Sequence, residues 1–210
     1  VNNSIDISEK LSKLEAEIST ILKDISVENT SIIEENYLEN SDETIQKHFP
    51  NCGIIFLHAY LNQFFEEQGI LINKKFKNRR CKIKAIQLML YLATSKLDFN
   101  EDSELSFFKI LVDIPTDDFI TFPKPLIKKE KAECDIVLQS LIEHWSVLKK
   151  TSIETLQYQF IQRNGLVSKE EKSIEIHLEK SGVDILLEHF PFNYSIIKLV
   201  WLKKILIIVL

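Results

Sequence analysis

The chain has 210 residues, of which 45% are hydrophobic and 27% charged, and its formal net charge is −5. This balance excludes a wholly disordered chain and fits one globular domain, or one domain with an extension. The apolar run at residues 205–210 is far too short to span a bilayer, and no secretory signal opens the sequence, so we expect no membrane association.

Residues 1–50 are predicted to form a coiled-coil-like helix followed by an acidic linker. The first 47 residues hold eleven acidic and four basic side chains. Apolar residues recur there at spacings of 4, 3, 4, 3 and 4, the seam of a heptad repeat: Ile7, Leu11, Leu14, Ile18, Ile21 and Ile25. Because β-branched residues fill many seam positions, we expect self-association, with a trimer favoured. One amphipathic helix packed on its own domain is the alternative.

A helix is predicted at residues 54–67, where apolar side chains recur at helical spacing and Gly69 provides a stop. The following segment, residues 74–84, has seven Lys or Arg and no acid. Few aromatic side chains lie near it, so nucleic acid binding is not expected. We interpret it as a solvated loop that faces an acidic partner, and the acidic stretch at residues 98–118 could meet it within the fold.

Further helices are predicted at residues 80–96, 103–112, 126–149 and 152–163. Ser152 would cap the last helix and Gly165 would end it. Six residues of the helix at 126–149 are expected to face inward: Ile136, Val137, Ser140, Leu141, His144 and Leu148. Large apolar side chains around this helix are expected to be mostly buried: Trp145, Leu141, Leu148, Phe160, Leu156 and Trp201.

The last forty residues change to a strand pattern. Apolar and polar residues alternate from Ile174 to Glu179, which predicts a half-buried strand, and residues 183–190 return to helix. Residues 195–199 and 205–210 are interpreted as two strands around a turn that contains Lys203 and Lys204. The predicted fold is α+β and mostly α-helical, with a small antiparallel sheet near the C-terminus. The final strand is apolar on both faces, so it should be central or covered.

The cysteines and histidines do not indicate a metal site or a disulfide framework. Cys52, Cys81 and Cys134 are odd in number and widely spaced, which favours a reducing compartment. A zinc site needs about four closely spaced ligands, and His48 with Cys52 is the only near pair. No cofactor or metal is therefore expected.

No catalytic pattern is present in the sequence. The four Gly are scattered, so there is no glycine-rich phosphate loop, and no Ser lies in a nucleophile elbow. Cys134 and His144 are ten residues apart, so their side chains cannot meet on one helix. We interpret His144 and Trp145 as a buried, hydrogen-bonded pair and expect a protein that is not an enzyme.

Five blocks, in this order, resemble those of the contractile injection system tape measure proteins. They are GIIFLHAYLNQFFEEQGIL (53–71), KAIQLMLYLAT (84–94), FFKILVDIP (107–115), LIEHWSVLKKTSIETLQYQFIQRNG (141–165) and VDILLEHFPFNYSIIKLVWL (183–202). His58, His144, Trp145 and Trp201 are the family-motif core. The chain departs from the family at a few positions: Ala59, Asn62, Lys150, Phe192, Val200 and the end of the chain.

The resemblance implies a structural protein that lies in the tube lumen and sets the tube length, while residues 51–210 dock at the baseplate or tip. Its partners would be tube, hub, spike or baseplate proteins, in the bacterial cytoplasm during assembly and then inside the tail-like particle. As a helix, residues 1–50 would span only about 75 Å. We therefore expect either the terminal part of a longer ruler or a short relative. The alternative function is a cap, an adaptor or a cargo-loading chaperone of the same particle.

Overall fold

The structure is a computed structural model that describes residues 47–99 and 102–210. The predicted coiled-coil helix, with its seam from Ile7 to Ile25, lies outside the described residues. Self-association through that seam therefore stays a prediction, as does a boundary between two regions near residue 50.

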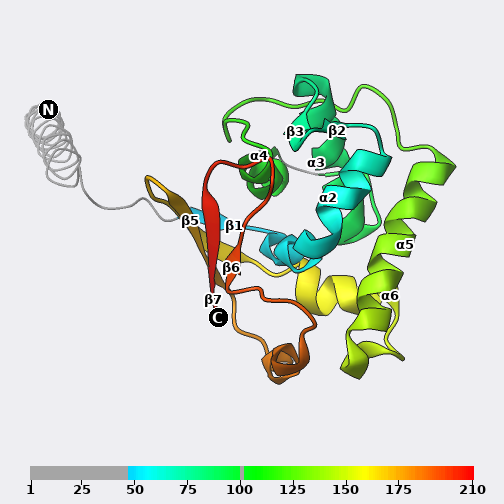
Figure 1. The fold of residues 1–210 in the computed structure, drawn as a ribbon, viewed down its shortest axis with the longest axis vertical. Coiled ribbons are helices and arrows are strands. Elements are labelled where there is room, and N and C mark those ends of the chain that lie inside the picture. Colours follow the sequence, from blue (N-terminus) through cyan, green and yellow to red (C-terminus); the bar gives the residue numbers. More distant parts are fainter. Residues whose placement is uncertain (1–46, 100–101) are drawn as a thin grey trace, which may run out of the picture. The chain divides into compact units, whose positions relative to one another are not determined.

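The helices lie close to where the sequence predicts them (Figure 1). They are α2 (His58–Glu67), α3 (Arg79–Thr94), α4 (Ser106–Leu111), α5 (Lys128–His144) and α6 (Ile153–Leu156), which a π-helical turn (Gln157–Ile161) continues. Shorter 3-10 turns are Cys52–Leu57, Asp102–Leu105, Ser146–Leu148 and Asp184–His189. Two of the predicted signals are confirmed, since Ser152 Oγ accepts from Thr155 N at 3.2 Å and Gly69, just beyond α2, has a φ of +67°.

The basic segment at residues 74–84 is not one loop, which corrects the prediction. Its start forms a hairpin of β2 (Leu71–Ile72) and β3 (Lys75–Phe76), and its second half is the first part of α3. The Asn78 side chain accepts from Cys81 N at 3.0 Å and so starts the helix early.

The predicted meeting of basic and acidic segments within the fold is confirmed. Arg79 pairs with Asp118 at 2.9 Å, and Lys82 lies 4.0 Å from Asp113. Lys84 pairs with Glu130 of α5 at 2.7 Å. Cations at a helix N-terminus oppose the helix dipole, and these acidic partners offset that cost.

A five-stranded sheet has the order β1-β4-β5-β7-β6. Its strands are β1 (Lys47–Phe49), β4 (Gly165–Lys169), β5 (Ser173–Leu178), β6 (Ile196–Ile197) and β7 (Ile205–Val209). The prediction of an antiparallel sheet is wrong for one pair, because β5 and β7 run parallel. The chain from 179 to 204 is long enough for the crossover that parallel strands need, and it places β6 antiparallel to β7 on the way.

Two predictions about these strands are confirmed. Ile174, Ile176 and Leu178 of β5 are buried, while the residues between them are half-buried. The apolar β7 is central, with β5 on one side and β6 on the other. β5 pairs with all five residues of β7, and β6 pairs with Leu206 and Ile207, so this strand is not at an edge of the sheet.

The core lies between the sheet and α5, which runs along the opposite side of the folded part (Figure 1). The turn Cys52–Leu57 is buried at all six residues and contacts β5, α3 and α5. Five of the six predicted core side chains are buried: Leu141, Trp145, Leu148, Leu156 and Phe160. The sixth, Trp201, is half-buried.

The prediction of the inward face of α5 is wrong at two positions. Ile136 is 63% exposed and the side chain of His144 is exposed. The buried face of the helix is Cys134, Val137, Leu138, Leu141 and Ile142. These residues follow the i, i+3, i+4, i+7, i+8 pattern of an amphipathic helix, and this register turns Ile136 outward.

Candidate functional site

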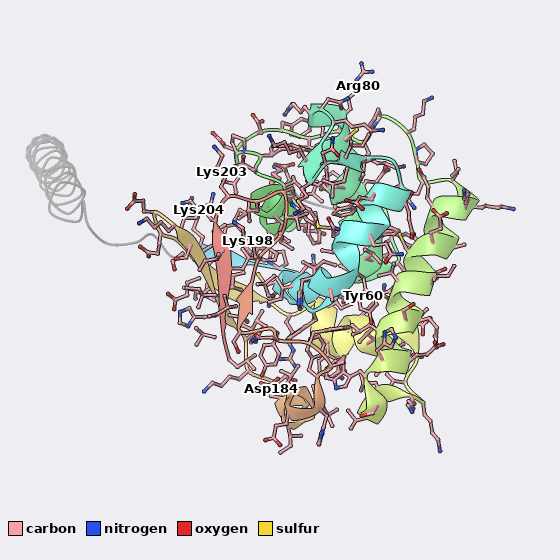
Figure 2. The ribbon with its side chains drawn as sticks, viewed as in Figure 1. Tyr60, Arg80, Asp184, Lys198, Lys203 and Lys204 are labelled. Carbon is pink, nitrogen blue, oxygen red and sulfur yellow. The ribbon has the colours of Figure 1, made fainter. Side chains whose placement is uncertain are left out.

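Three of the sequence blocks meet in a cluster of aromatic and histidine side chains, which we call the aromatic cluster. It consists of the half-buried His58 and Tyr60 on α2, the exposed His144 at the end of α5, and the half-buried Phe192. Phe192 packs edge-on against Tyr60 at 5.5 Å and against His58 at 6.1 Å, measured between ring centroids. Tyr60 lies between α2 and α5 (Figure 2). The cluster therefore fixes α2, α5 and the C-terminal segment against one another.

Hydrogen bonds join α2 to the last turn of α5. The Tyr60 hydroxyl oxygen lies 2.6 Å from His144 Nδ1 and 3.3 Å from the carbonyl oxygen of Ser140. One hydroxyl proton serves only one acceptor. Both contacts are satisfied when His144 Nδ1–H donates to the hydroxyl oxygen and Tyr60 O–H donates to Ser140. The rings of Tyr60 and His144 also stack, with an interplanar angle of 13°.

Burial changes the acidity of two members of this cluster. It raises the pKa of Tyr60 to about 12, so the phenol stays neutral at physiological pH. It lowers the pKa of His58, and the hydrogen bond between His58 Nδ1 and the Ile55 carbonyl oxygen, 2.9 Å long, opposes this shift in part. Burial therefore favours the neutral form of both groups.

The lowered pKa of His58 predicts a loss of stability in mild acid. The unfolded chain takes up a proton near pH 6.5, whereas folded His58 does so only at lower pH. The free energy of unfolding should therefore reach its full value above the pKa of the unfolded chain, near pH 6.5, and should decrease as the pH drops below that value. Urea unfolding between about pH 7.5 and pH 5 would measure this, and His58→Gln should flatten the dependence. The exposed His189→Gln serves as control, and an unchanged slope in His58→Gln would refute the assignment.

Trp145 lies beneath the aromatic cluster and is fully buried. Its ring centroid is 4.6 Å from that of Phe160 and 4.9 Å from that of Phe190, and its Nε1 donates to the Leu186 carbonyl oxygen at 3.1 Å. The prediction that His144 and Trp145 form a buried, hydrogen-bonded pair is therefore wrong. Trp145 is the first residue beyond α5 and has extended backbone angles, so its side chain turns away from the exposed His144.

Trp201 belongs to a different aromatic group. Its ring centroid is 5.3 Å from that of Phe65 and 5.4 Å from that of Phe76, and its Nε1 donates to the Leu111 carbonyl oxygen at 2.9 Å. The four family-motif residues therefore do not form one site. His58 is a half-buried and His144 an exposed member of the aromatic cluster, Trp145 packs beneath them, and Trp201 fastens the C-terminal segment to α4.

Sequence reasoning missed two ion pairs in which a buried basic side chain meets a half-buried aspartate. Arg163 is buried, pairs with Asp184 at 2.5 Å, and has its guanidinium carbon 5.2 Å from the centroid of the Phe160 ring. Lys109 is fully buried, pairs with Asp102, and donates to the Thr116 carbonyl oxygen at 3.1 Å. Arg163 lies in the R-x-G that closes one block and Asp184 is the second residue of the next, which is the signal that the sequence offers for this pair.

The described residues do not offer an evident reaction centre. They contain no group of three or more His, Cys, Asp or Glu placed to hold a metal ion. Burial raises the pKa of the Cys52 and Cys134 thiols, so both stay protonated and weakly nucleophilic. None of the described helices combines the length and the apolar character that crossing a membrane requires.

Comparison with protein families gives a match over nearly the whole chain. A family model described as "Contractile injection system tape measure protein" matches residues 3–209. The match includes all five sequence blocks, the aromatic cluster and the region upstream of β1. Comparisons with curated proteins and with solved structures give no match.

Proposed function

Because this chain belongs to the contractile injection system tape measure protein family, we propose that it sets the length of the tube and docks at the baseplate or tip. The observation that carries this proposal is the family match over nearly the whole chain. A tape measure is a structural part of its particle, which favours a structural role over a catalytic one.

The fold supports separate roles for two regions of the chain, docking for the folded part and length control for the region upstream of β1. β1 pairs with β4 residue by residue from Lys47 to Phe49, so the chain is closed into the sheet from residue 47 onward. The ion pair of the buried Arg163 with Asp184, and the position of β7 between two other strands, favour one fixed shape for the rest. A part of fixed shape can dock but cannot scale with tube length. Length control then belongs to the region upstream of β1, including the predicted trimeric seam at residues 7–25.

The partners that follow from this proposal are tube, hub, spike or baseplate proteins. Assembly would take place in the bacterial cytoplasm, and the chain would then remain inside the finished particle. A cap or an adaptor would also remain there, whereas a cargo-loading chaperone would leave before completion.

Quantitative mass spectrometry of purified, fully assembled particles tests whether the chain is a permanent part. We expect this chain at a fixed ratio to the baseplate proteins, and at a multiple of three copies if the seam forms a trimer. An abundant cytoplasmic protein provides the background level. A chain found only at background would show that it is a loading factor, and the tape measure role would be lost.

A further inference from the structure

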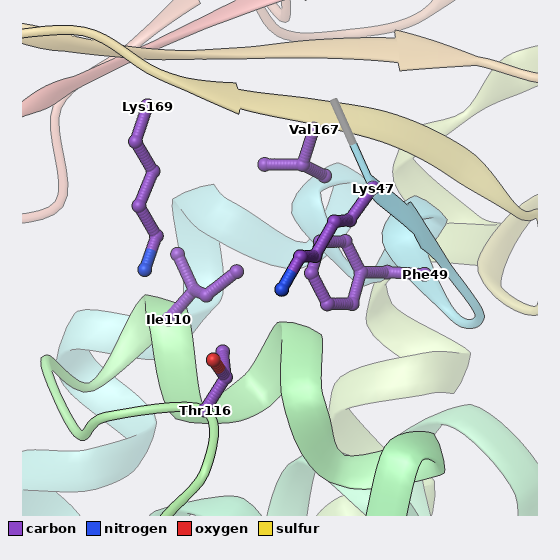
Figure 3. A pocket seen from close by; sticks show the side chains of 6 residues that line it. All are labelled: Lys47, Phe49, Ile110, Thr116, Val167 and Lys169. Atoms are coloured by element: carbon purple, nitrogen blue, oxygen red, sulfur yellow. The ribbon is translucent and has the colours of Figure 1, made fainter. Parts of the chain in front are cut away.

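Two adjoining hollows lie between the sheet and α4. The first has a volume of about 300 Å³ and is lined by Lys47, Phe49, Ile110, Thr116, Val167 and Lys169 (Figure 3). The second has a volume of about 270 Å³, shares Ile110 and Lys169 with the first, and extends along Ile114, Ile174, Leu202, Lys203 and Lys204. We call the two together the lysine groove.

The floor of the lysine groove is apolar and its rim is cationic. Phe49, Val167 and Ile174 come from the sheet, Ile110 comes from α4, and all four are buried. Lys47 of β1 and Lys169 of β4 point into the first hollow (Figure 3). Lys203 and Lys204 lie at the second hollow, in the turn before β7 (Figure 2).

The positive charge of this rim is largely unmatched by the residues that line it. Among the described lining residues the single acid is Asp113, and it lies 4.0 Å from Lys82. Lys204 Nζ donates to the Glu170 carbonyl oxygen, which is neutral. Glu170 and Glu171 occupy the turn beyond Lys169 and are not among the described lining residues. The described lining of the groove therefore combines four lysines and one acid with an apolar floor.

We propose that the lysine groove binds an acidic peptide segment of a partner protein, with its carboxylates on the lysines and an apolar side chain on the floor. The complementarity of charge and the apolar floor carry the proposal. Each hollow has room for one or two side chains. The inference rests on the proposed function only in taking the partner to be a tube, hub, spike or baseplate protein.

Other polyanions fit this groove less well. Single-stranded nucleic acid is held by exposed aromatic side chains on which bases stack, and Phe49, the one aromatic among the described lining residues, is only 9% exposed.

Fluorescence anisotropy on the full chain tests the proposal with a labelled twelve-residue peptide of Glu and Asp that carries two Leu. We expect saturable binding that weakens with salt, and a loss of about tenfold in affinity in the variant Lys47→Glu/Lys169→Glu. The control Lys149→Glu/Lys150→Glu makes the same change of charge on two exposed lysines and should bind within about twofold of the parent chain. The neutral variant Lys47→Gln/Lys169→Gln repeats the test if the charge reversal disturbs folding.

Several results would overturn the inference. Equal losses of affinity in the groove variant and in the control would mean that overall charge attracts the peptide. Unchanged affinity after both Leu of the peptide are replaced by Ser would mean the same. Tighter binding of an oligonucleotide of matching charge would assign the groove to nucleic acid. Self-association in sedimentation that the groove variants abolish would assign it to a second copy. Each of these outcomes is measured on the purified chain and the peptide. The proposed function is tested separately, by mass spectrometry of assembled particles.

Discussion

Trp145→Ala is expected to lower the free energy of unfolding by about 3–5 kcal/mol, as large aromatic truncations in protein cores do. The side chain is fully buried, so its loss leaves a cavity lined by Phe160 and Phe190. The carbonyl oxygen of Leu186 also loses its indole donor. Because Trp145 joins α5 to the segment around Asp184–His189, the aromatic cluster above it should loosen as well.

Chemical denaturation of the purified chain measures this loss. Tyr158→Ala is the matched control, since it also removes an aromatic side chain, but one that is 72% exposed. Its effect should stay within about 0.5 kcal/mol. A loss below about 1 kcal/mol for Trp145→Ala would contradict the packing described above.

The sequence was most informative where a pattern is local. Alternation from Ile174 to Leu178 predicts β5, and the apolar run at 205–210 predicts a central strand, as the sheet shows. Ser152 caps α6 as its position suggests. In each case the side chains of one short segment already carry the information about burial or capping.

Contacts between distant segments could not be predicted in this way. β1 has only three residues and owes its existence to pairing with β4, more than a hundred residues later. Gly53 shows the same limit, because a Cβ there would lie 1.7 Å from the carbonyl oxygen of Phe160. Nothing near Gly53 in the sequence indicates that close approach. The approach itself explains why only glycine fits at this position.

The candidate site was predicted only in part, for the same physical reason. The resemblance named His58 and His144. Tyr60 and Phe192 complete the aromatic cluster through contacts between residues that are far apart in the sequence. The error at His144 and Ile136 came from extending the buried face of α5 beyond its true edge. Cys134 lies on the true face, and counting it as an apolar residue would have given the correct register.

The second large effect concerns the length of the particle. If the region upstream of β1 is the ruler, duplicating residues 5–25 inserts 21 residues, or three heptads, and keeps the seam in phase. The tube should then lengthen by at most about 32 Å, the rise of a helix of that size. The folded part, closed by the pairing of β1 with β4, should dock as before.

A matched control places the same 21 residues in the folded part, between the exposed Glu171 and Lys172 of the turn from β4 to β5. This insertion lengthens the chain equally but leaves the region upstream of β1 unchanged. It should alter the yield of particles and not their length. The substitution Ile208→Asp, in the centre of the sheet, should likewise reduce assembly without changing the length of the particles that form.

The length distribution of particles in electron micrographs is the most direct test of this account. We predict a shift to longer tubes for the insertion upstream of β1 and an unchanged length for the insertion after Glu171. Tubes of normal length in both variants would contradict the account and show that this chain is not the ruler.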